Sequence, residues 1–214
     1  MSVSADVAAK TPTTRGQPGR RAETRRRLAE AGAAVFAEQG LHGATSVAIA
    51  KRAGVATGTF YLHFADKHAL FSEIVDATLA ELRARQERAA AALAPGDDEL
   101  RVQLGVLADF TQDKRDLIRV TFERGGENAE IAARIHDQTA GRVEATLRRM
   151  AEHAPLPVHP AAAAQARAAT LIRVIAWWAE DPARATREEI VETLYHLAPT
   201  RLVRAAAQRP DPQE

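Results

Sequence analysis

Residues able to bind nucleic acid lie close together in one short stretch, residues 45–71. Its small and polar members, with one leucine, are Thr57, Gly58, Thr59, Tyr61, Leu62, His63 and Lys67. Small residues and hydroxyl groups allow a close approach to base edges, and leucine can contact the methyl group of thymine. Tyr61, His63 and Lys67 carry hydrogen-bond donors suited to phosphate oxygens. The stretch therefore has the chemistry of DNA recognition, with base contacts and phosphate contacts on different side chains.

Two short helices joined by a tight turn are expected to present these side chains. Thr45 can cap a first helix with apolar residues three and four positions apart, and Gly54 supplies the left-handed residue that ends it. The N-terminus of this helix, at Thr45, is also suited to a phosphate. A second helix over residues 57–63 directs Phe60, together with Phe64 just after it, toward the core. This pattern is typical of a helix-turn-helix.

The same stretch resembles the N-terminal DNA-binding domain of the TetR-type (tetracycline-repressor-like) transcriptional regulators. The matching residues are Thr45-x-x-x-Ile49-Ala50, Ala53-Gly54-Val55, Gly58-Thr59-Phe60-Tyr61-x-His63-Phe64 and Lys67-x-x-Leu70-Phe71. The resemblance covers residues 20–75 and also implies the phosphate contacts of Tyr61, His63 and Lys67. For the remainder it implies an all-helical body that binds a ligand and forms a dimer.

The sequence departs from the family pattern at two positions. The family usually has Ser or Thr where Ala56 stands, as the cap of the second short helix, and an acid where Ala48 stands. The loss of such a cap costs on the order of 1 kcal/mol. We therefore expect Thr57 as the alternative cap.

The composition favours an all-α protein and gives no sign of catalysis. Ala, Leu, Arg and Glu are strong helix formers, and aromatic residues make up only 5% of the chain. The absence of cysteine excludes disulfides and thiolate metal sites, and no Gly-x-Ser-x-Gly, His-Glu-x-x-His or glycine-rich phosphate loop is present. We expect no enzyme, no metal and no cofactor. Without a long apolar run or a secretory pattern, we also expect a cytoplasmic protein that does not enter a membrane.

Charge is distributed unevenly along the chain. Residues 1–71 carry ten Lys or Arg against five Asp or Glu, a net of +5. Residues 72–214 carry nineteen against twenty-three, a net of −4. A solvated basic face and a nucleic-acid surface both fit the basic part, and the helix-turn-helix beside it favours nucleic acid.

These observations divide the chain into four parts. We expect a disordered basic arm over residues 1–19, a helix-turn-helix domain over 20–65, a helical effector-binding and dimerisation domain over 66–208 and a loose tail over 209–214. Arg15, Arg20 and Arg21 lie where an arm could reach phosphates or a minor groove. An arm that only aids solubility fits the sequence equally well.

A long helix from Asp66, its expected N-cap, to Ala94 would join the DNA-binding part to the body. A regulatory ligand should therefore contact this helix or its neighbours. The surrounding helices offer a mainly apolar lining with few polar groups, as a small organic molecule needs. The candidate residues are Leu107, Phe110, Thr111, Ile118, Phe122, Ile135 and His136. Ordinary core packing is the alternative role for each of them.

The last two major helices carry more apolar surface than one packing face can bury. The residues concerned are Leu171, Val174, Ile175, Trp177, Trp178, Ile190, Leu194 and Tyr195. A two-fold symmetric four-helix interface would bury the excess, and the alternative is that both tryptophans lie in the internal core.

Taken together, the sequence predicts a ligand-responsive repressor that binds a palindromic DNA operator as a homodimer. A small hydrophobic ligand of unknown identity would release it from the operator. The alternative is a helical module that binds a small ligand or a partner and does not act as a repressor.

Overall fold

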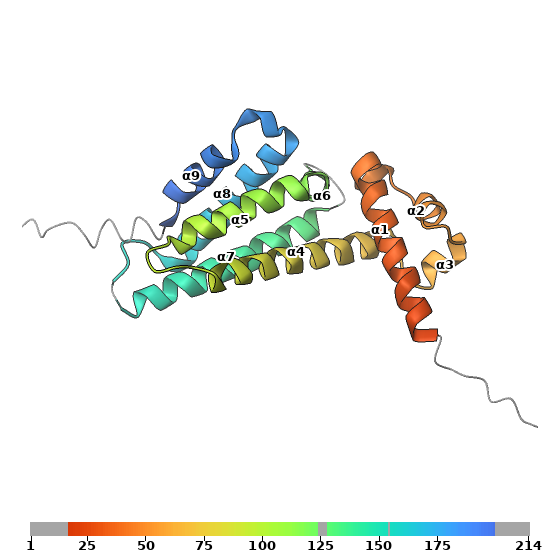
Figure 1. The fold of residues 1–214 in the computed structure, drawn as a ribbon, viewed down its shortest axis with the longest axis horizontal. Coiled ribbons are helices and arrows are strands. Elements are labelled where there is room, and N and C mark those ends of the chain that lie inside the picture. Colours follow the sequence, from red (N-terminus) through yellow and green to blue (C-terminus); the bar gives the residue numbers. More distant parts are fainter. Residues whose placement is uncertain (1–16, 124–127, 154, 200–214) are drawn as a thin grey trace, which may run out of the picture.

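The computed structural model describes residues 17–123, 128–153 and 155–199. Within these ranges the regular structure is helical and contains no strand, which confirms the all-α prediction. The elements are α1 (Gln17–Gly43), α2 (Ser46–Arg52), α3 (Thr57–Tyr61), α4 (Lys67–Ala91), α5 (Glu99–Asp113), α6 (Arg115–Thr121), α7 (Ala129–Ala151), α8 (Pro160–Glu180), η2 (Pro182–Arg184) and α9 (Arg187–His196). Helices α1 to α3 form a head at one end of the molecule, and the other helices form an elongated body (Figure 1).

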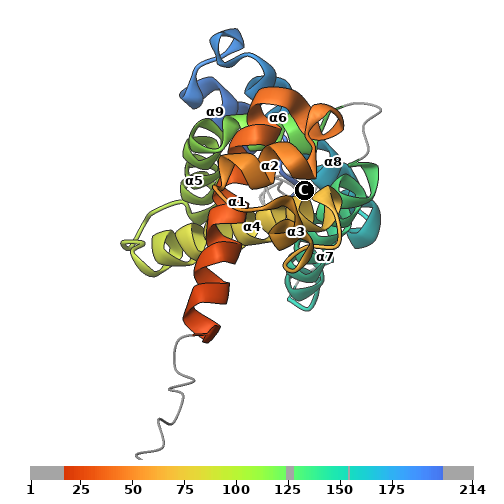
Figure 2. The same ribbon diagram turned by 90° about the vertical axis from the view of Figure 1, so that its right-hand side faces the viewer.

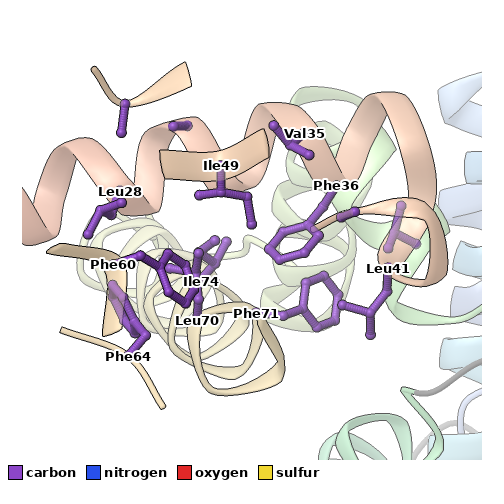
Figure 3. Close-up of a cluster of buried hydrophobic side chains, with 14 of the residues drawn as sticks. Leu28, Val35, Phe36, Leu41, Ile49, Phe60, Phe64, Leu70, Phe71 and Ile74 are labelled. Carbon is purple, nitrogen blue, oxygen red and sulfur yellow. The ribbon is translucent and has the colours of Figure 1, made fainter. Parts of the chain in front are cut away.

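One apolar core holds the head together, and α1, α2, α3 and the first turns of α4 share it (Figure 3). Val120 of α6 and Ile135 of α7 also belong to this core. Its fully buried members are Leu28, Phe36, Ile49, Ala50, Phe60, Leu70 and Phe71. Phe36 and Phe71 meet edge to face with ring centroids 5.1 Å apart, an arrangement that aromatic rings favour. At Gly32, α1 and α4 approach so closely that a methyl group would lie 2.7 Å from a methyl carbon of Leu70.

The apolar spacing of Leu28, Val35 and Phe36 predicts a helix over residues 21–39 that stops at Gly40, and α1 differs from this prediction at both ends. It begins at Gln17, so Arg20 and Arg21 belong to the helix and not to a preceding arm. At Gly40 φ is 69°, a conformation that glycine adopts without a steric penalty, and the chain kinks there before a last turn ends at Gly43. Arg15 and the other residues of the predicted arm up to 16 lie outside the described residues.

Helix α4 runs out of the head and along the body, as Figure 1 shows. Asp66 caps it, as predicted, by accepting a hydrogen bond of 2.8 Å from the Ala69 N–H. The first turns bury Leu70 and Phe71 in the head core, whereas Leu82 belongs to a second core in the body. Helix α4 is therefore part of both cores, as is α6, which places Val120 in the head core and Ile118 in the second core.

The second core lies between α4, α5, α6, α8 and α9. Asp98 caps α5, and Thr186 with Glu189 forms a capping box at the start of α9. The sequence predicts Asn128 as the cap of α7. Its side-chain amide instead donates to the carbonyls of Val120 and Thr121 at the end of α6.

Two further expectations cannot be followed in the structure. The sequence predicts that Gly125-Gly126 ends the helix before it, but these residues lie outside the described residues. The chain after residue 199, including the predicted tail, also lies outside them. Among the helices that are described, none combines the length and the apolar character needed to cross a membrane.

The head core gives a prediction about stability. Phe71→Ala should lower the free energy of unfolding by about 3–5 kcal/mol, because it removes a fully buried ring and leaves a cavity. Leu62→Ala is the control, and it should change stability by less than about 0.5 kcal/mol because Leu62 is exposed. Urea unfolding followed by circular dichroism measures the free energy of unfolding of both variants. Equal decreases in the two variants would show that packing in the head core does not stabilise the fold.

Candidate nucleic-acid interface

Helices α2 and α3 lie next to each other at one end of the molecule (Figures 1 and 2). Thr45 is extended, with φ −126°, and its hydroxyl accepts a 3.1 Å hydrogen bond from the Ala48 N–H, so the predicted cap of α2 is confirmed. Gly54 adopts a φ of 66°, and the next N–H, of Val55, donates to the carbonyl of Ala50 at 3.0 Å. These local bonds set the turn of the helix-turn-helix.

Helix α3 begins at Thr57 without a side-chain cap. Ala56 occupies the cap position in extended backbone geometry, and no side chain bonds to the first turn. The expectation that Thr57 replaces the missing cap is therefore wrong, because Thr57 is already the first helical residue. Tertiary contacts must hold this short helix in place.

Phe60 and Phe64 provide those contacts, since both are buried in the head core as predicted. Arg25 of α1 adds a polar clamp beside them. Its guanidinium lies 4.3 Å from the centroid of the Phe64 ring and donates a 2.7 Å hydrogen bond to the His63 carbonyl. The same guanidinium forms an ion pair with Glu73 of α4. One side chain therefore connects α1, the end of α3 and α4.

The opposite side of α3 is exposed. Leu62 has 73% and Tyr61 57% of its surface accessible, and Thr57 and Thr59 are partly exposed. A methyl group added at Gly58 would meet nothing within 4 Å, so packing within the protein does not require glycine at this position. The residues predicted to meet base edges thus share an open face.

An exposed valine in α2 adds an apolar contact that the sequence interpretation did not include. Val47 is 59% exposed, although its helix buries Ile49 and Ala50. Its position off the apolar stripe of α2 was the available signal. Lys51 is exposed in the last turn of the same helix.

The predicted phosphate-binding residues differ in their surroundings. Lys67 is partly buried, and its ammonium donates to the carbonyls of Leu41 and His42 at 2.9 and 3.2 Å, at the end of α1. The Nδ1 atom of His63 is buried and, among the described residues, has no hydrogen-bond partner. Burial, followed by the charges of Arg21 and Arg25, lowers the pKa of His63. Its imidazole is therefore neutral at pH 7.

The candidate effector residues are divided between the two cores. Phe110, Thr111 and Ile118 are buried, and the Thr111 hydroxyl is satisfied by the carbonyl of Leu107 at 2.7 Å. Ile135 belongs to the head core. Leu107 is partly buried against the body core, and Phe122 packs against both cores. His136 is also partly buried, and its Nδ1 lies 3.4 Å from the carboxylate of Asp137.

A cavity of about 540 Å³ lies where the head meets the body. It is lined by Ala37, Glu38, Gln39, Gly40, Arg119, Val120, Phe122, Glu123, Ala176 and Glu180. Phe122 is thus one predicted effector residue that borders a cavity. In the described part of the chain, no group of His, Asp and Glu residues is arranged to hold a metal ion.

The structure separates the residues predicted for the dimer interface into two groups. Ile175, Trp178, Ile190, Leu194 and Tyr195 are buried inside the protomer. The Trp178 indole N–H donates to the Ala185 carbonyl at 2.8 Å, so this ring lies in the internal core instead of at an interface.

The second group remains accessible. Leu171 and Val174 are partly buried, and Trp177 is 37% exposed. A mainly apolar groove of about 290 Å³ lies along α8 and α9, lined by Arg173, Val174, Trp177, Ala185, Glu189, Ile190 and Thr193.

Comparison with known proteins identifies the head. The helix-turn-helix defines a class of DNA-binding domains, and residues 28–74 match the model of the bacterial regulatory proteins of the tetR family. Residues 28–74 are therefore similar to the DNA-binding part of the tetR family, and the resemblance found in this stretch of the sequence is confirmed. An uncharacterized HTH-type transcriptional regulator, YdgC of Bacillus subtilis, is 34% identical over 106 residues, which are 47% of this chain and 53% of that protein. The chain spans about half the length of the curated relatives it matches.

Solved structures support the fold of about four fifths of the chain. FadR from Bacillus subtilis in complex with stearoyl-CoA has a TM-score of 0.64 at 20% identity, covering 79% of this chain and 96% of its own. The SmeT–triclosan complex has a TM-score of 0.62 at 20% identity, covering 80% and 90%. At these identities the likeness concerns the fold alone.

The surroundings of His63 predict a pH dependence of stability. Because its folded pKa lies below the value of about 6.5 for an unperturbed histidine, protonation favours the unfolded chain. The contribution of neutral His63 is complete above pH 6.5 and is lost as the pH falls through the folded pKa. Thermal unfolding between pH 8 and 5 should show a smaller decrease in Tm for His63→Gln than for the unchanged chain. Parallel curves would rule out this assignment.

Proposed function

We propose that this chain is a transcriptional repressor that binds a palindromic DNA operator as a homodimer and is released by a small hydrophobic ligand. The main support is the division of α3 into a buried face with Phe60 and an open face with Gly58 and Leu62. The match of residues 28–74 to the tetR family supports the same assignment.

The open face suits the major groove of DNA. Thr57 and Thr59 can exchange hydrogen bonds with base edges, and Leu62 and Val47 can contact thymine methyl groups. Because Gly58 brings no side chain, the backbone of α3 can approach the bases closely. Base contacts of this kind select a sequence, whereas phosphate contacts fix the orientation of the protein.

Phosphate binding would come from the borders of this face. Tyr61 is exposed, and Thr45 lies at the N-terminus of α2, where the helix dipole favours an anion. His63 and Lys67 follow the C-terminal end of α3. A phosphate would raise the depressed pKa of His63, so DNA binding at this residue would be coupled to proton uptake.

Release by a ligand requires two states of the protein that differ in affinity for the ligand. The body offers the apolar candidate residues on α5, α6 and α7, and the cavity at the head–body junction lies between α1, α6 and α8. Arg119 of α6 donates a 3.3 Å hydrogen bond to the Ala37 carbonyl of α1. Movement of α6 on ligand binding would therefore act directly on the head. The structural neighbours that bind stearoyl-CoA and triclosan are consistent with ligand binding by such a fold.

A homodimer through α8 and α9 would cover the groove beside Trp177. Trp177 and Val174 lie on α8, and Leu197 follows the last residue of α9. All three have accessible apolar surface, which a second copy would remove from water. Two heads related by two-fold symmetry would then meet two half-sites of a palindrome.

The division of contacts on DNA is tested with two variants. Lys67→Ala should weaken binding to all sequences alike and lower the slope of log K against log salt by about one unit. Thr57→Ala should instead change the preference among operator variants. Fluorescence anisotropy with palindromic fragments from the DNA upstream of its own gene measures both. If the unchanged chain shows no salt-dependent binding to any fragment, the chain is a helical binding module and not a repressor.

The proposed dimer is tested by a charge on its groove. Trp177→Glu should convert the dimer to a monomer at micromolar concentration, because a carboxylate would be desolvated in an apolar interface. Leu62→Glu is the matched control, since it places the same charge on an exposed apolar position of the head. Sedimentation velocity distinguishes the species. A dimer that persists in Trp177→Glu would place the interface elsewhere.

A further inference from the structure

The cavity between the head and the body is large enough for a small molecule. Its volume of about 540 Å³ lies within the range of ligand pockets, roughly 300–1,000 Å³. Helix α6 packs against both α1 and α8 at this junction (Figures 1 and 2). Val120, Phe122 and Ala176 give the cavity an apolar side. A molecule bound there would contact the head and the body at once.

Three helices end at this cavity. The long part of α1 ends at the kink at Gly40, Phe122 follows the last residue of α6, and Glu180 is the last residue of α8. All three residues line the cavity. The C-terminal end of a helix carries a partial negative charge, because its last carbonyl groups point away from the helix. The main chain around the cavity therefore favours a cation.

The protein already places guanidinium groups at two of these helix ends. Arg119 donates to the Ala37 carbonyl near the kink of α1 at 3.3 Å, and Arg115 donates to the Ala179 carbonyl at the end of α8 at 2.9 Å. These bonds show that the helix ends attract cations, but they also offset part of the dipoles. The charges of the side chains therefore decide what the cavity can bind.

Two acidic residues of the lining are compensated by arginines that do not line the cavity. Glu38 pairs with Arg52 of α2 at 2.7 Å, and Glu180 pairs with Arg184 of η2 at 2.9 Å. Neither carboxylate leaves a full negative charge to the cavity.

Glu123 is the third acidic residue of the lining, and its charge is not compensated within the described residues, where it forms no ion pair. Arg119 also lines the cavity, but it bonds to Ala37 and lies 3.8 Å from the carboxylate of Asp116. The carboxylate of Glu123 faces the kink of α1, since a methyl group added at Gly40 would lie 3.7 Å from its Oε2. The cavity thus combines an apolar side with one available negative charge.

We propose that this cavity binds an organic cation that carries an apolar group. The cationic group would lie at Glu123, and the apolar group would pack against Val120, Phe122 and Ala176. The ring of Phe122 adds attraction for a cation through its π electrons. A metal ion suits the site less well, because in the described part of the chain no acidic or histidine side chains are grouped to coordinate one.

The position of the cavity gives the bound cation a regulatory role. Because α1 forms one wall and α6 and α8 form the others, the occupant would favour one arrangement of head and body. The ligand of the proposed repressor would then be an amphipathic organic cation; this link alone rests on the proposed function.

Isothermal titration calorimetry at constant ionic strength, without DNA, tests the site. Benzyltrimethylammonium should bind once per protomer with a Kd in the millimolar range or below, as a ligand of this size reaches. Benzyl alcohol and benzoate, which are neutral and anionic, should bind at least about tenfold more weakly. Equal affinity for benzyl alcohol, or no binding of the cation, would overturn the proposal.

Variants of the lining locate the bound cation. Glu123→Gln should weaken binding about two- to fivefold, as the loss of a partly solvated ion pair does, and Glu123→Lys should weaken it more than about tenfold. Ala176→Leu should abolish binding by filling the cavity, since Ala176 is 5% exposed and lines it. If Ala176→Leu does not fold, Glu123→Lys decides alone, because Glu123 is exposed.

Glu87→Gln is the matched control, since it removes the charge of an exposed glutamate of α4 that does not line the cavity. Its Kd for the cation should equal that of the unchanged chain. Unchanged binding in Glu123→Lys, or equal weakening in Glu87→Gln, would show that the cation does not bind at Glu123.

Fluorescence anisotropy with a palindromic DNA fragment tests the regulatory link. Saturating benzyltrimethylammonium should change the DNA affinity of the unchanged chain about fivefold or more, and it should leave that of Glu123→Lys unchanged. A bound cation without effect on DNA affinity would overturn the link but not the site. A chain that binds no DNA would overturn the proposed function, and the calorimetric result would stand.

Discussion

The constraint on which the structure depends is that α4 belongs to two cores. Its first turns bury Leu70 and Phe71 in the head, and Leu82 lies in the body core. Polar contacts strengthen both attachments, since Arg25 of α1 pairs with Glu73, and Arg134 of α7 pairs with Asp76 at 2.7 Å. Close-packed cores do not deform continuously, so a shift of α4 relative to the body must be transmitted to the head.

This constraint explains how a helix as short as α3 can present a recognition surface. An isolated helix of five residues would not be stable in water, and α3 also lacks a side-chain cap. Its position comes instead from Phe60 and Phe64 in the core and from Arg25 at its end. The open face of α3 is therefore rigidly placed relative to α4, as sequence-specific binding to DNA requires.

The sequence was sufficient to predict the structure where neighbouring residues determine it. Thr45, Gly54 and Asp66 act as predicted because a cap or a left-handed residue depends on a few neighbouring atoms. The sequence was insufficient to predict contacts between residues that are distant along the chain. The periodicity of α8 marks both Trp177 and Trp178 as apolar, but only the packing of η2 and α9 shows that Trp178 is internal. The same reason applies to Lys67, whose bonds to the end of α1 join residues about 25 positions apart.

The most direct test of the proposed repressor is the distance between its two recognition helices on DNA. The chain contains no cysteine, so Leu62→Cys allows one spin label in each protomer at an exposed site. Pulsed electron paramagnetic resonance should give a single distance of about 34–36 Å on a palindromic operator, one turn of DNA, because both helices must enter successive major grooves. No measurable distance between labels, or a distance that does not match the spacing of the grooves, would contradict the proposal.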